Sequence, residues 1–578
     1  MKYALQAPIN PESCGGGKCI LKNQTKFYKG RTGPARMTRS GGLFFIDFLG
    51  YIKIMFRGEI KREIEKTIQE VFPALGGPAL GWSVESQENP EHGDYSSNIA
   101  LVLAKNEGKN PREVAEELKN ELLRRPTSKL DFIEKIETAG PGFLNFFIAK
   151  KALVQALGNP VSKLAKKQKI NIEFVSANPT GPLTMANGRG GFYGDALANI
   201  LEASGHKVTR EYYINDAGNQ IKLLGESIQA AEGNPPAGGP EREAMLYKGE
   251  YIKKLKGKTA KQAAAFLLKE IKNSLKKADI KFDAWFSEEK NLHKKNELKK
   301  VLLFLNKKKV LHEKDGALWL DEAVVIKSNK EQTYFLADLA YHYDKFIKRK
   351  FDTAIDIWGA DHHGYIERMK KGIEAIGVSP DRLQIIIMQL VRLIRGGKEV
   401  KMSKRTGEFV TLDELLKEVG ADAARWFFLE RSPNTHMDFD MDLAKERSKK
   451  NPVYYVQYAH ARACSILQKG KPGKKADLEL LSQPEELALI KKILRLPEII
   501  EDAANDYQVH RLTRYAYELA QAFTNFYEKH QVIYPEQSRW IDKKNKELTE
   551  ARLALVSAAK KILKQTLGLM GISAPEKM

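Results

Sequence analysis

The stretch that most constrains the fold runs from Ile170 to Asp216 and alternates strand, turn, helix and strand. It opens with INIEFVSA, which has the composition of a buried strand, and continues into NPTGPL, a turn marked by Asn-Pro and Gly-Pro pairs. GRGGFYGDALANILEASG carries apolar residues at helical spacing and ends at Gly205, and TREYYIND has the pattern of the next strand. A β–α–β unit of this kind predicts a parallel, doubly wound α/β sheet.

Further domains are predicted on either side, because 578 residues are too many for one ordinary core. Helical periodicity begins near Glu59 and the strand-like IEKIETAGPGFLNFFI follows, whereas the chain from Asn451 onward is helical almost throughout. Sheet-type pattern is expected in ALWL, AVVI, YFLADLAYHYDKF and TAIDIWGADHHG. The expected ranges are 1–54 (a disordered extension, or a start upstream of the true one at Met55), 55–150 (a small α+β domain), 170–445 (the sheet domain, with a helical insertion at about 231–311) and 450–578 (a helical domain).

Composition narrows the class of protein. The net charge of +22 favours a polyanionic partner such as nucleic acid, although lysines spread over solvated faces, as in Lys307-Lys308-Lys309, would give the same total. Three cysteines exclude a disulfide scaffold and fit a reducing cytoplasm. Cys14 and Cys19 lack the second Cys or His pair that a zinc site needs, so no protein-held metal is predicted. No apolar stretch is long enough for a membrane span.

The tetrapeptide Lys401-Met402-Ser403-Lys404 is the sharpest motif, because of its surroundings. It follows the strand-like RLQIIIMQLVRLIRGGKEV and precedes TLDELLKEVG, a helix capped by threonine. Two ammonium groups in such a loop can neutralise the charge that develops on a leaving pyrophosphate. The alternative is a solvated basic loop.

A second candidate phosphate site is the turn NPTGPLTMANGRGG, which leads into the predicted helix. Backbone N–H groups at a helix start attract anions, and small residues let a nucleotide approach. The stretch matches neither the P-loop nor the G-x-G-x-x-G fingerprint. The alternative is a glycine-rich turn that packs the helix on the strand.

From Met55 to Met578 the chain resembles the arginyl-tRNA synthetases of class I. The resemblance is carried by NIEFVSANPTGPLTMANGRGGFYGDALANILEASGHKVTREYYINDAGNQI, YFLADLAYHYDKF, IWGADHHGYIERM, VKMSKRTGEFVTLDELLKEVGADAARWFFL, NPVYYVQYAHARACSIL and LMGISAPEKM. It implies a Rossmann-like catalytic domain, an N-terminal domain that touches the tRNA elbow, and a helical anticodon-binding domain. It also implies that ATP, with Mg²⁺, activates L-arginine for transfer to the 3′ end of tRNA-Arg.

The chain departs from the family at the HIGH-type signature. That motif should lie at 184–187, where the sequence is Thr184-Met185-Ala186-Asn187, so both histidines are absent. In the family these histidines hydrogen-bond the ATP phosphates. Thr184 can donate an O–H and Asn187 an amide N–H, so donors are kept while a positive charge is lost.

The resemblance also implies an arginine pocket. Asn178 matches the family's contact to the substrate ammonium or carboxylate, and Tyr334 and Asp338, four apart, match residues that meet the guanidinium. A carboxylate and a planar guanidinium form a bidentate pair that a lysine substrate could not copy. Glu173 and Asp361 are further candidate pocket acids.

For ATP, the resemblance implies contacts from residues that follow predicted strands. A metal site is an alternative for Asp361-His362-His363 with His342 upstream, but a nucleotide-lining or structural role suits the carboxyl edge of a parallel sheet better. The expected ATP contacts are Gly188, Gly359, His362, Lys401, Met402, Ser403 and Lys404, and the expected catalytic groups are Lys401, Lys404, Asn187 and Thr184.

The helical domain offers candidate tRNA contacts in Tyr454, Tyr458, Arg462 and Arg514, through stacking and phosphate binding. The alternative for each tyrosine is the bundle core. We expect a monomer in the cytoplasm. Two other functions stay open: a non-catalytic tRNA-binding paralogue, which would explain the lost histidines but not the KMSK motif, and a class I synthetase for another amino acid.

Overall fold

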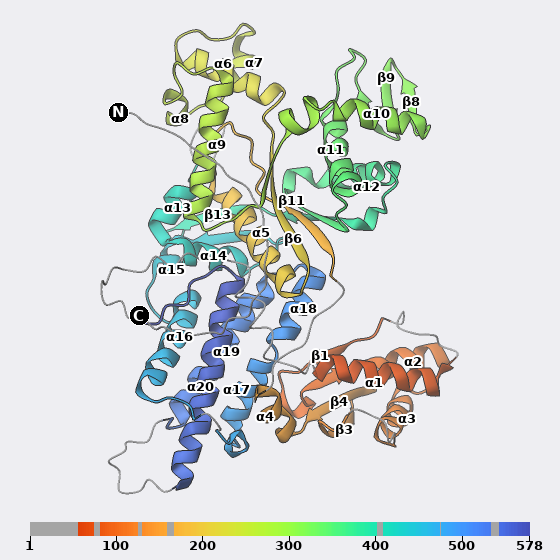
Figure 1. Ribbon diagram of the computed structural model, residues 1–578, viewed down its shortest axis with the longest axis vertical. Helices are drawn as coiled ribbons and strands as arrows, with labels where there is room; N and C mark the ends of the chain where they lie inside the picture. Colours follow the sequence, from red (N-terminus) through yellow and green to blue (C-terminus); the bar gives the residue numbers. More distant parts are fainter. Residues whose placement is uncertain are drawn as a thin grey trace, which may run out of the picture. The chain divides into compact units, whose positions relative to one another are not determined.

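The computed structural model describes residues 56–73, 81–124, 130–158, 167–400, 409–473, 476–532 and 543–578. The expected extension 1–54, with Cys14 and Cys19, and the KMSK residues 401–404 lie outside the described residues. The described part contains an N-terminal α+β region, a central parallel sheet and a helical C-terminal region, coloured in chain order in Figure 1. None of its helices combines the length and apolarity that crossing a membrane requires.

The N-terminal region is built on an antiparallel sheet in the order β1-β2-β4-β3. Helix α1 (Phe56–Val71) is amphipathic, and Ile60 and Ile64 on its apolar face are fully buried. The strand-like segment predicted here forms two paired strands, β3 and β4. The elements are β1 (Val84–Ser86), β2 (Tyr95–Ser97), α2 (Ile99–Glu107), α3 (Pro111–Arg124), β3 (Ile133–Ala139) and β4 (Phe143–Ile148), followed by α4 (Lys150–Gly158).

The central sheet confirms the predicted parallel, doubly wound topology. Its order is β12-β11-β5-β6-β7, and every neighbouring pair is parallel. The chain runs outward from β5 to β6 and β7, then returns to β11 and β12 on the other side of β5. The order therefore reverses between β5 and β11. The strands are β5 (Lys169–Glu173), β6 (Lys207–Ile214), β7 (Ala284–Ser287), β11 (Thr353–Gly359) and β12 (Leu383–Met388).

Helix α5 (Met185–Ala203) follows β5, as predicted, and its glycines let it pack closely. A Cβ at Gly194 would lie 2.3 Å from the ring of Phe174 at the end of β5. A Cβ at Gly188 would lie 2.8 Å from the Leu412 side chain. Glycine at position 194 is therefore a packing requirement of α5, whereas a side chain at position 188 would need only the end of the Leu412 side chain to shift.

The range 231–311 differs from the predicted helical insertion. Helices α7 (Gly239–Ala244), α8 (Glu250–Lys253) and α9 (Ala260–Lys277) pack with α6 (Asn219–Ala231) around a small core of their own. However, β7 lies inside the same range and extends the central sheet beside β6. Its four residues, AWFS, are too few to show strand periodicity, and a helix, α10 (Glu297–Lys307), follows.

The prediction that YFLADLAYHYDKF belongs to a sheet is wrong. Thr333 caps a helix, α11 (Tyr334–Tyr343), by accepting a hydrogen bond from Leu336 N, and a π-helical turn, Asp344–Lys348, follows. Most of α11 is buried, so its apolar residues face several directions and the helical period is hidden.

ALWL and AVVI are strands, as predicted, but they stand outside the central sheet. They form β9 (Ala317–Leu320) and β10 (Ala323–Ile326), which pair with β8 (Leu311–Lys314) in a separate antiparallel sheet. TAIDIWG is β11 of the central sheet, and a short 3₁₀ helix (Ala360–Tyr365) and α12 (Ile366–Ala375) follow it.

The segments that flank the KMSK motif agree with prediction. The strand-like run before it forms β12, β13 (Val391–Arg395) and β14 (Lys398–Val400), and the helix after it, α13 (Leu412–Val419), has Thr411 in a capping box with Glu414. α14 (Ala421–Leu429), β15 (Met437–Asp440) and α15 (Met441–Lys445) complete this part. β15 pairs with β13 in a three-stranded sheet.

The C-terminal region is helical, as predicted. Its helices are α16 (Pro452–Lys469), α17 (Pro484–Leu494), α18 (Leu496–Asp506), α19 (His510–Lys529) and α20 (Lys543–Leu569). α16, α17, α19 and α20 pack against one another.

Candidate active site

The carboxyl ends of β5 and β11 meet where the strand order reverses, which is the place where open α/β sheets bind ligands. β5 ends at Glu173, which is paired in register with Asp356 of β11. After β5 the chain passes through Val175 and Ser176, whose φ angles of 67° and 37° are left-handed. A β-branched residue seldom adopts that conformation, so this turn is held by its surroundings. It leads to Asn178, which is partly exposed.

Thr184 and Asn187, the residues at the HIGH-type position, hydrogen-bond each other. Thr184 is the N-cap of α5 and is 6% exposed. Its backbone N–H and its hydroxyl both donate to the Asn187 amide oxygen, at 3.0 and 2.9 Å. The Thr184 hydroxyl is therefore engaged in the helix cap. The Asn187 amide nitrogen makes no hydrogen bond to a described residue, so Asn187 keeps a donor for a ligand.

The start of α5 is tied directly to the chain that follows the KMSK motif. Met185 N donates to Val410 O at 3.0 Å, and Leu412 N donates to Leu183 O at 2.8 Å. The start of α5 and the segment 410–412 are thus neighbours, although they are more than two hundred residues apart in sequence.

Arg189, which no sequence motif predicts as a site residue, forms a buried clamp one turn further along α5. Its guanidinium is 1% exposed and donates to three backbone carbonyls, those of Gln389, Ser432 and Thr435, at 2.6, 3.0 and 2.9 Å. Burial lowers the pKa of Arg189 to about 10, so it stays charged at neutral pH. Gln389 lies between β12 and β13, so Arg189 links α5 to the strands that lead to the KMSK motif.

Asp338 and Tyr334 lie on α11, near the carboxyl edge of the sheet. Tyr365 donates its hydroxyl proton to Asp338 Oδ2 at 2.7 Å. Burial raises the pKa of Asp338 to about 6, although the Tyr365 hydrogen bond and His342 oppose the shift. Tyr334 is 57% exposed at the first turn of the helix. A partly desolvated carboxylate beside an accessible tyrosine suits a cationic planar group.

Glu173 differs from Asp338 because it is already paired. Lys345, which is fully buried, donates to Glu173 Oε2 at 2.8 Å and to Asp356 Oδ1 at 2.7 Å. His342 lies 2.8 Å from the other oxygen of Asp356. Sequence alone does not predict Lys345, because the pattern of residues 334–346 indicates a sheet. On a helix, Asp338, His342 and Lys345 share a face by their spacing.

Asp361 and His362 are not part of this buried group. Their side chains are 81% and 57% exposed, and His362 Nε2 lies 3.6 Å from Asp361 Oδ2. Among the described residues no three acidic, histidine or cysteine side chains, His342, His362 and His363 included, gather around one metal position. Gly359 ends β11 at the carboxyl edge, which is compatible with a nucleotide approaching the backbone there.

The predicted tRNA contacts lie on α16 and α19. Tyr454 and Tyr458 are partly exposed and stack with their ring centroids 6.5 Å apart. Arg462 donates to the Tyr458 hydroxyl at 2.8 Å, one turn further on. These three residues form a partly exposed aromatic and basic row on α16. Arg514 is exposed and is bonded to Glu518 and Glu88, at 2.8 and 2.6 Å.

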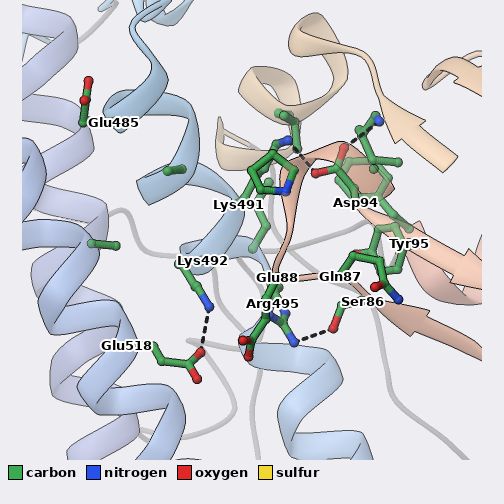
Figure 2. A pocket seen from close by; sticks show the side chains of 18 of the residues that line it. Ser86, Gln87, Glu88, Asp94, Tyr95, Glu485, Lys491, Lys492, Arg495 and Glu518 are labelled. Carbon is green, nitrogen blue, oxygen red and sulfur yellow. Dashed lines mark hydrogen bonds and ion pairs between the residues drawn. The ribbon is translucent and has the colours of Figure 1, made fainter. Parts of the chain in front are cut away.

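A pocket elsewhere in the molecule lies between the first strands of the N-terminal region and helices α17 and α19 (Figure 2). Its charged side chains are paired, with Lys491 bonded to Asp94 at 2.5 Å and Lys492 to Glu518 at 2.7 Å. None of the predicted catalytic, ATP-binding or arginine-binding residues lines this pocket.

Three family sequence models match successive parts of the chain. The arginyl-tRNA synthetase N-terminal domain matches residues 58–148. The class I tRNA synthetase (R) catalytic domain matches residues 149–238 and 241–450. The DALR anticodon-binding domain matches residues 456–578.

Similar proteins span most of this chain. An arginine–tRNA ligase of Caldanaerobacter subterraneus is 41% identical over 538 residues, which cover 86% of this chain and 93% of the relative. Another, from Carboxydothermus hydrogenoformans, is 41% identical over 571 residues and covers 91% of this chain and all of the relative.

Solved structures agree on the fold. A Campylobacter jejuni structure described as an arginyl-tRNA synthetase is 34% identical, with a TM-score of 0.62 over 72% of this chain and 95% of its own. The Thermus thermophilus arginyl-tRNA synthetase is 23% identical, with a TM-score of 0.74 over 91% of this chain and all of its own, and it supports the fold alone. The sheet edge, the three matched domains and the relatives together establish that this chain belongs to the arginyl-tRNA synthetase family of class I.

Proposed function

We propose that this protein is an active arginine–tRNA ligase that uses ATP to join L-arginine to the 3′ end of tRNA-Arg. The observation that carries the proposal is the similarity to arginine–tRNA ligases at 41% identity across 86% of the chain, in all three domains. The same similarity favours the ligase over the non-catalytic paralogue and over a synthetase for another amino acid.

The reaction has two steps. The arginine carboxylate attacks the α-phosphorus of ATP, forming arginyl-adenylate and releasing pyrophosphate. A ribose hydroxyl of the terminal tRNA adenosine then attacks the carbonyl carbon of the adenylate, forming the ester and releasing AMP. Neither step needs a covalent enzyme intermediate, so the protein contributes positioning and charge stabilisation.

For arginine, Asp338 is proposed to pair with the guanidinium and Tyr334 to cover it. Asp338 suits this role because its carboxylate is partly desolvated. The electrostatic attraction between this carboxylate and a substrate cation is therefore stronger than it would be at the surface. Asn178, after β5, is proposed to bind the substrate ammonium or carboxylate. Glu173 is proposed to line the pocket with one of its oxygens held by Lys345, and the exposed Asp361 has the weakest support as a pocket acid.

For ATP, the proposed contacts are the Asn187 amide, the backbone N–H groups at the start of α5, and Gly359 and His362 at the edge of β11. Lys401 and Lys404, in the KMSK motif with Met402 and Ser403, are proposed to neutralise the leaving pyrophosphate. The described residues hold no cluster of three acidic, histidine or cysteine side chains that could bind a metal. Mg²⁺ is therefore proposed to be held mainly by the ATP phosphates.

For tRNA, the proposed contacts are the row Tyr454, Tyr458 and Arg462, where a base could stack on the exposed ring faces. Arg514 is proposed to exchange its present acidic partners for a phosphate. The N-terminal region is proposed to touch the tRNA elbow. We also propose that the protein works as a monomer in the cytoplasm.

The test is aminoacylation of purified tRNA with each amino acid in turn, in the presence of ATP and Mg²⁺. Formation of arginyl-tRNA is expected. Charging with another amino acid but not arginine would refute the substrate, and tRNA binding without any charging would support the paralogue.

A further inference from the structure

A continuous chain of hydrogen bonds joins the two acids on which arginine recognition is proposed to depend. It starts at the Asp338 carbonyl oxygen, which lies 2.7 Å from His342 Nδ1, and passes from His342 Nε2 to Asp356 at 2.8 Å. Lys345 then bridges Asp356 and Glu173, at 2.7 and 2.8 Å. The three middle members are 3%, 1% and 0% exposed for His342, Asp356 and Lys345.

The hydrogen bonds show which acids along this chain have partners. Lys345 donates to both Glu173 and Asp356, and His342 lies against the second oxygen of Asp356. Of the three acids, Asp338 is the one whose carboxylate is bonded to no lysine, arginine or histidine among the described residues; it accepts from the Tyr365 hydroxyl.

The other buried acids near this face are also paired. Glu211 is bound by Arg349, and Glu288 lies 3.0 Å from His293. A guanidinium placed beside Asp338 would therefore give this carboxylate the cationic partner that it lacks among the described residues.

Lys345 is needed for a physical reason that lies in the sheet. Glu173 and Asp356 are register partners on adjacent parallel strands, so their backbones are held about 4.8 Å apart. The two carboxylates therefore lie side by side and away from water, where they repel each other strongly unless a cation lies between them. The π-helical turn Asp344–Lys348 delivers the Lys345 ammonium to that position.

We propose that Lys345 is a positioning residue for arginine recognition: it aims the Glu173 carboxylate and occupies both Glu173 and Asp356, so that Asp338 is the carboxylate left for the guanidinium. This proposal rests on the proposed function. The Asp338 carboxylate then favours a substrate side chain with a positive charge over a neutral one of the same shape, such as the ureido group of citrulline.

The test compares Lys345→Met with Lys348→Met. Lys348 lies one turn away and is bonded to Glu297, which Lys300 also holds, so it controls for loss of a nearby lysine. In steady-state aminoacylation, Lys345→Met is expected to raise KM for arginine roughly ten- to a hundredfold, the range for losing a hydrogen bond to a charged group. KM for ATP and for tRNA should stay within about twofold, and Lys348→Met should resemble the wild type.

A second variant guards against a folding defect. Lys345→Met combined with Asp356→Asn removes one positive and one negative charge, so the net buried charge is unchanged while Glu173 still loses its lysine. A raised KM for arginine in this variant, with a melting temperature near that of the wild type, supports positioning. An unchanged KM for arginine, or a uniform loss of kcat with every KM unchanged, overturns the proposal. A wild-type protein that does not charge arginine would instead refute the proposed function.

Discussion

At the scale of single residues, the Asp338 carboxyl couples arginine recognition to pH. Burial raises its pKa to about 6, above its ordinary value of 3.8, so the free protein holds it protonated at lower pH. Only the carboxylate pairs with a guanidinium, so kcat/KM for arginine should fall roughly tenfold per pH unit below about 6. The free energy of unfolding changes in the opposite direction from arginine binding. The folded protein binds the Asp338 proton more tightly than the unfolded chain does, so this carboxyl adds stability as pH falls from about 6 toward 3.8.

The measurement is a pH profile of kcat/KM for arginine in the wild type and in Asp338→Asn. The variant should bind arginine poorly and lack the inflection near pH 6. An inflection that persists in Asp338→Asn would assign it to another group.

Asn187 has two possible roles, helix capping and donation to a phosphate, which two substitutions separate. Its amide oxygen accepts from Thr184, whereas its amide nitrogen is available for a ligand. Asn187→Asp keeps the capping acceptor and removes the donor, and Asn187→Ala removes both. If the donor binds ATP, each should lower kcat for adenylate formation roughly a hundredfold, with tRNA affinity nearly unchanged. Near-normal kcat in Asn187→Asp would mean that Asn187 only caps α5.

At the scale of elements, Arg189 joins α5 to the segments around β12, β13 and β15 through three backbone carbonyls. A lysine has one compact ammonium and cannot reproduce that planar fork. Arg189→Lys should therefore destabilise the protein by about 2 kcal/mol, measured by chemical denaturation. Arg392→Lys, an exposed arginine on β13 bonded to Asp438, is the matched control and should leave the unfolding midpoint unchanged. Equal effects of the two substitutions would argue against the clamp.

At the scale of the whole molecule, the last residues of the chain bind back onto other elements. Gln457 donates to the Ser573 carbonyl at 3.0 Å, and Ser573 N donates to Asp422 at 3.0 Å. Deleting residues 571–578 should lower the melting temperature and arginine charging together. Deleting residues 1–54 should leave both unchanged, because the match to the family begins at residue 58. Thermal unfolding and aminoacylation of the two truncated proteins test this contrast, and the opposite ranking would contradict it.

Local sequence determined most of the secondary structure that builds the site. The β5–α5–β6 unit, the strands before the KMSK motif and the helix capped by Thr411 all follow from periodicity and capping over a few residues. The same holds for the helical C-terminal region. Family membership was also recognisable from sequence, because it depends on which residues stand in those local motifs.

Only the tertiary structure determined the conformation of β7 and α11 and the burial of Lys345. β7 is a strand because β6 offers its free edge, not because four residues show a period. α11 is a helix whose burial on most sides hides its period and made it resemble a strand. Lys345 is a surface-type residue by composition, yet it is fully buried because two carboxylates from neighbouring strands need a cation between them. Burial, charge pairing and sheet edges are made by residues far apart in the chain, so only the folded arrangement determines them.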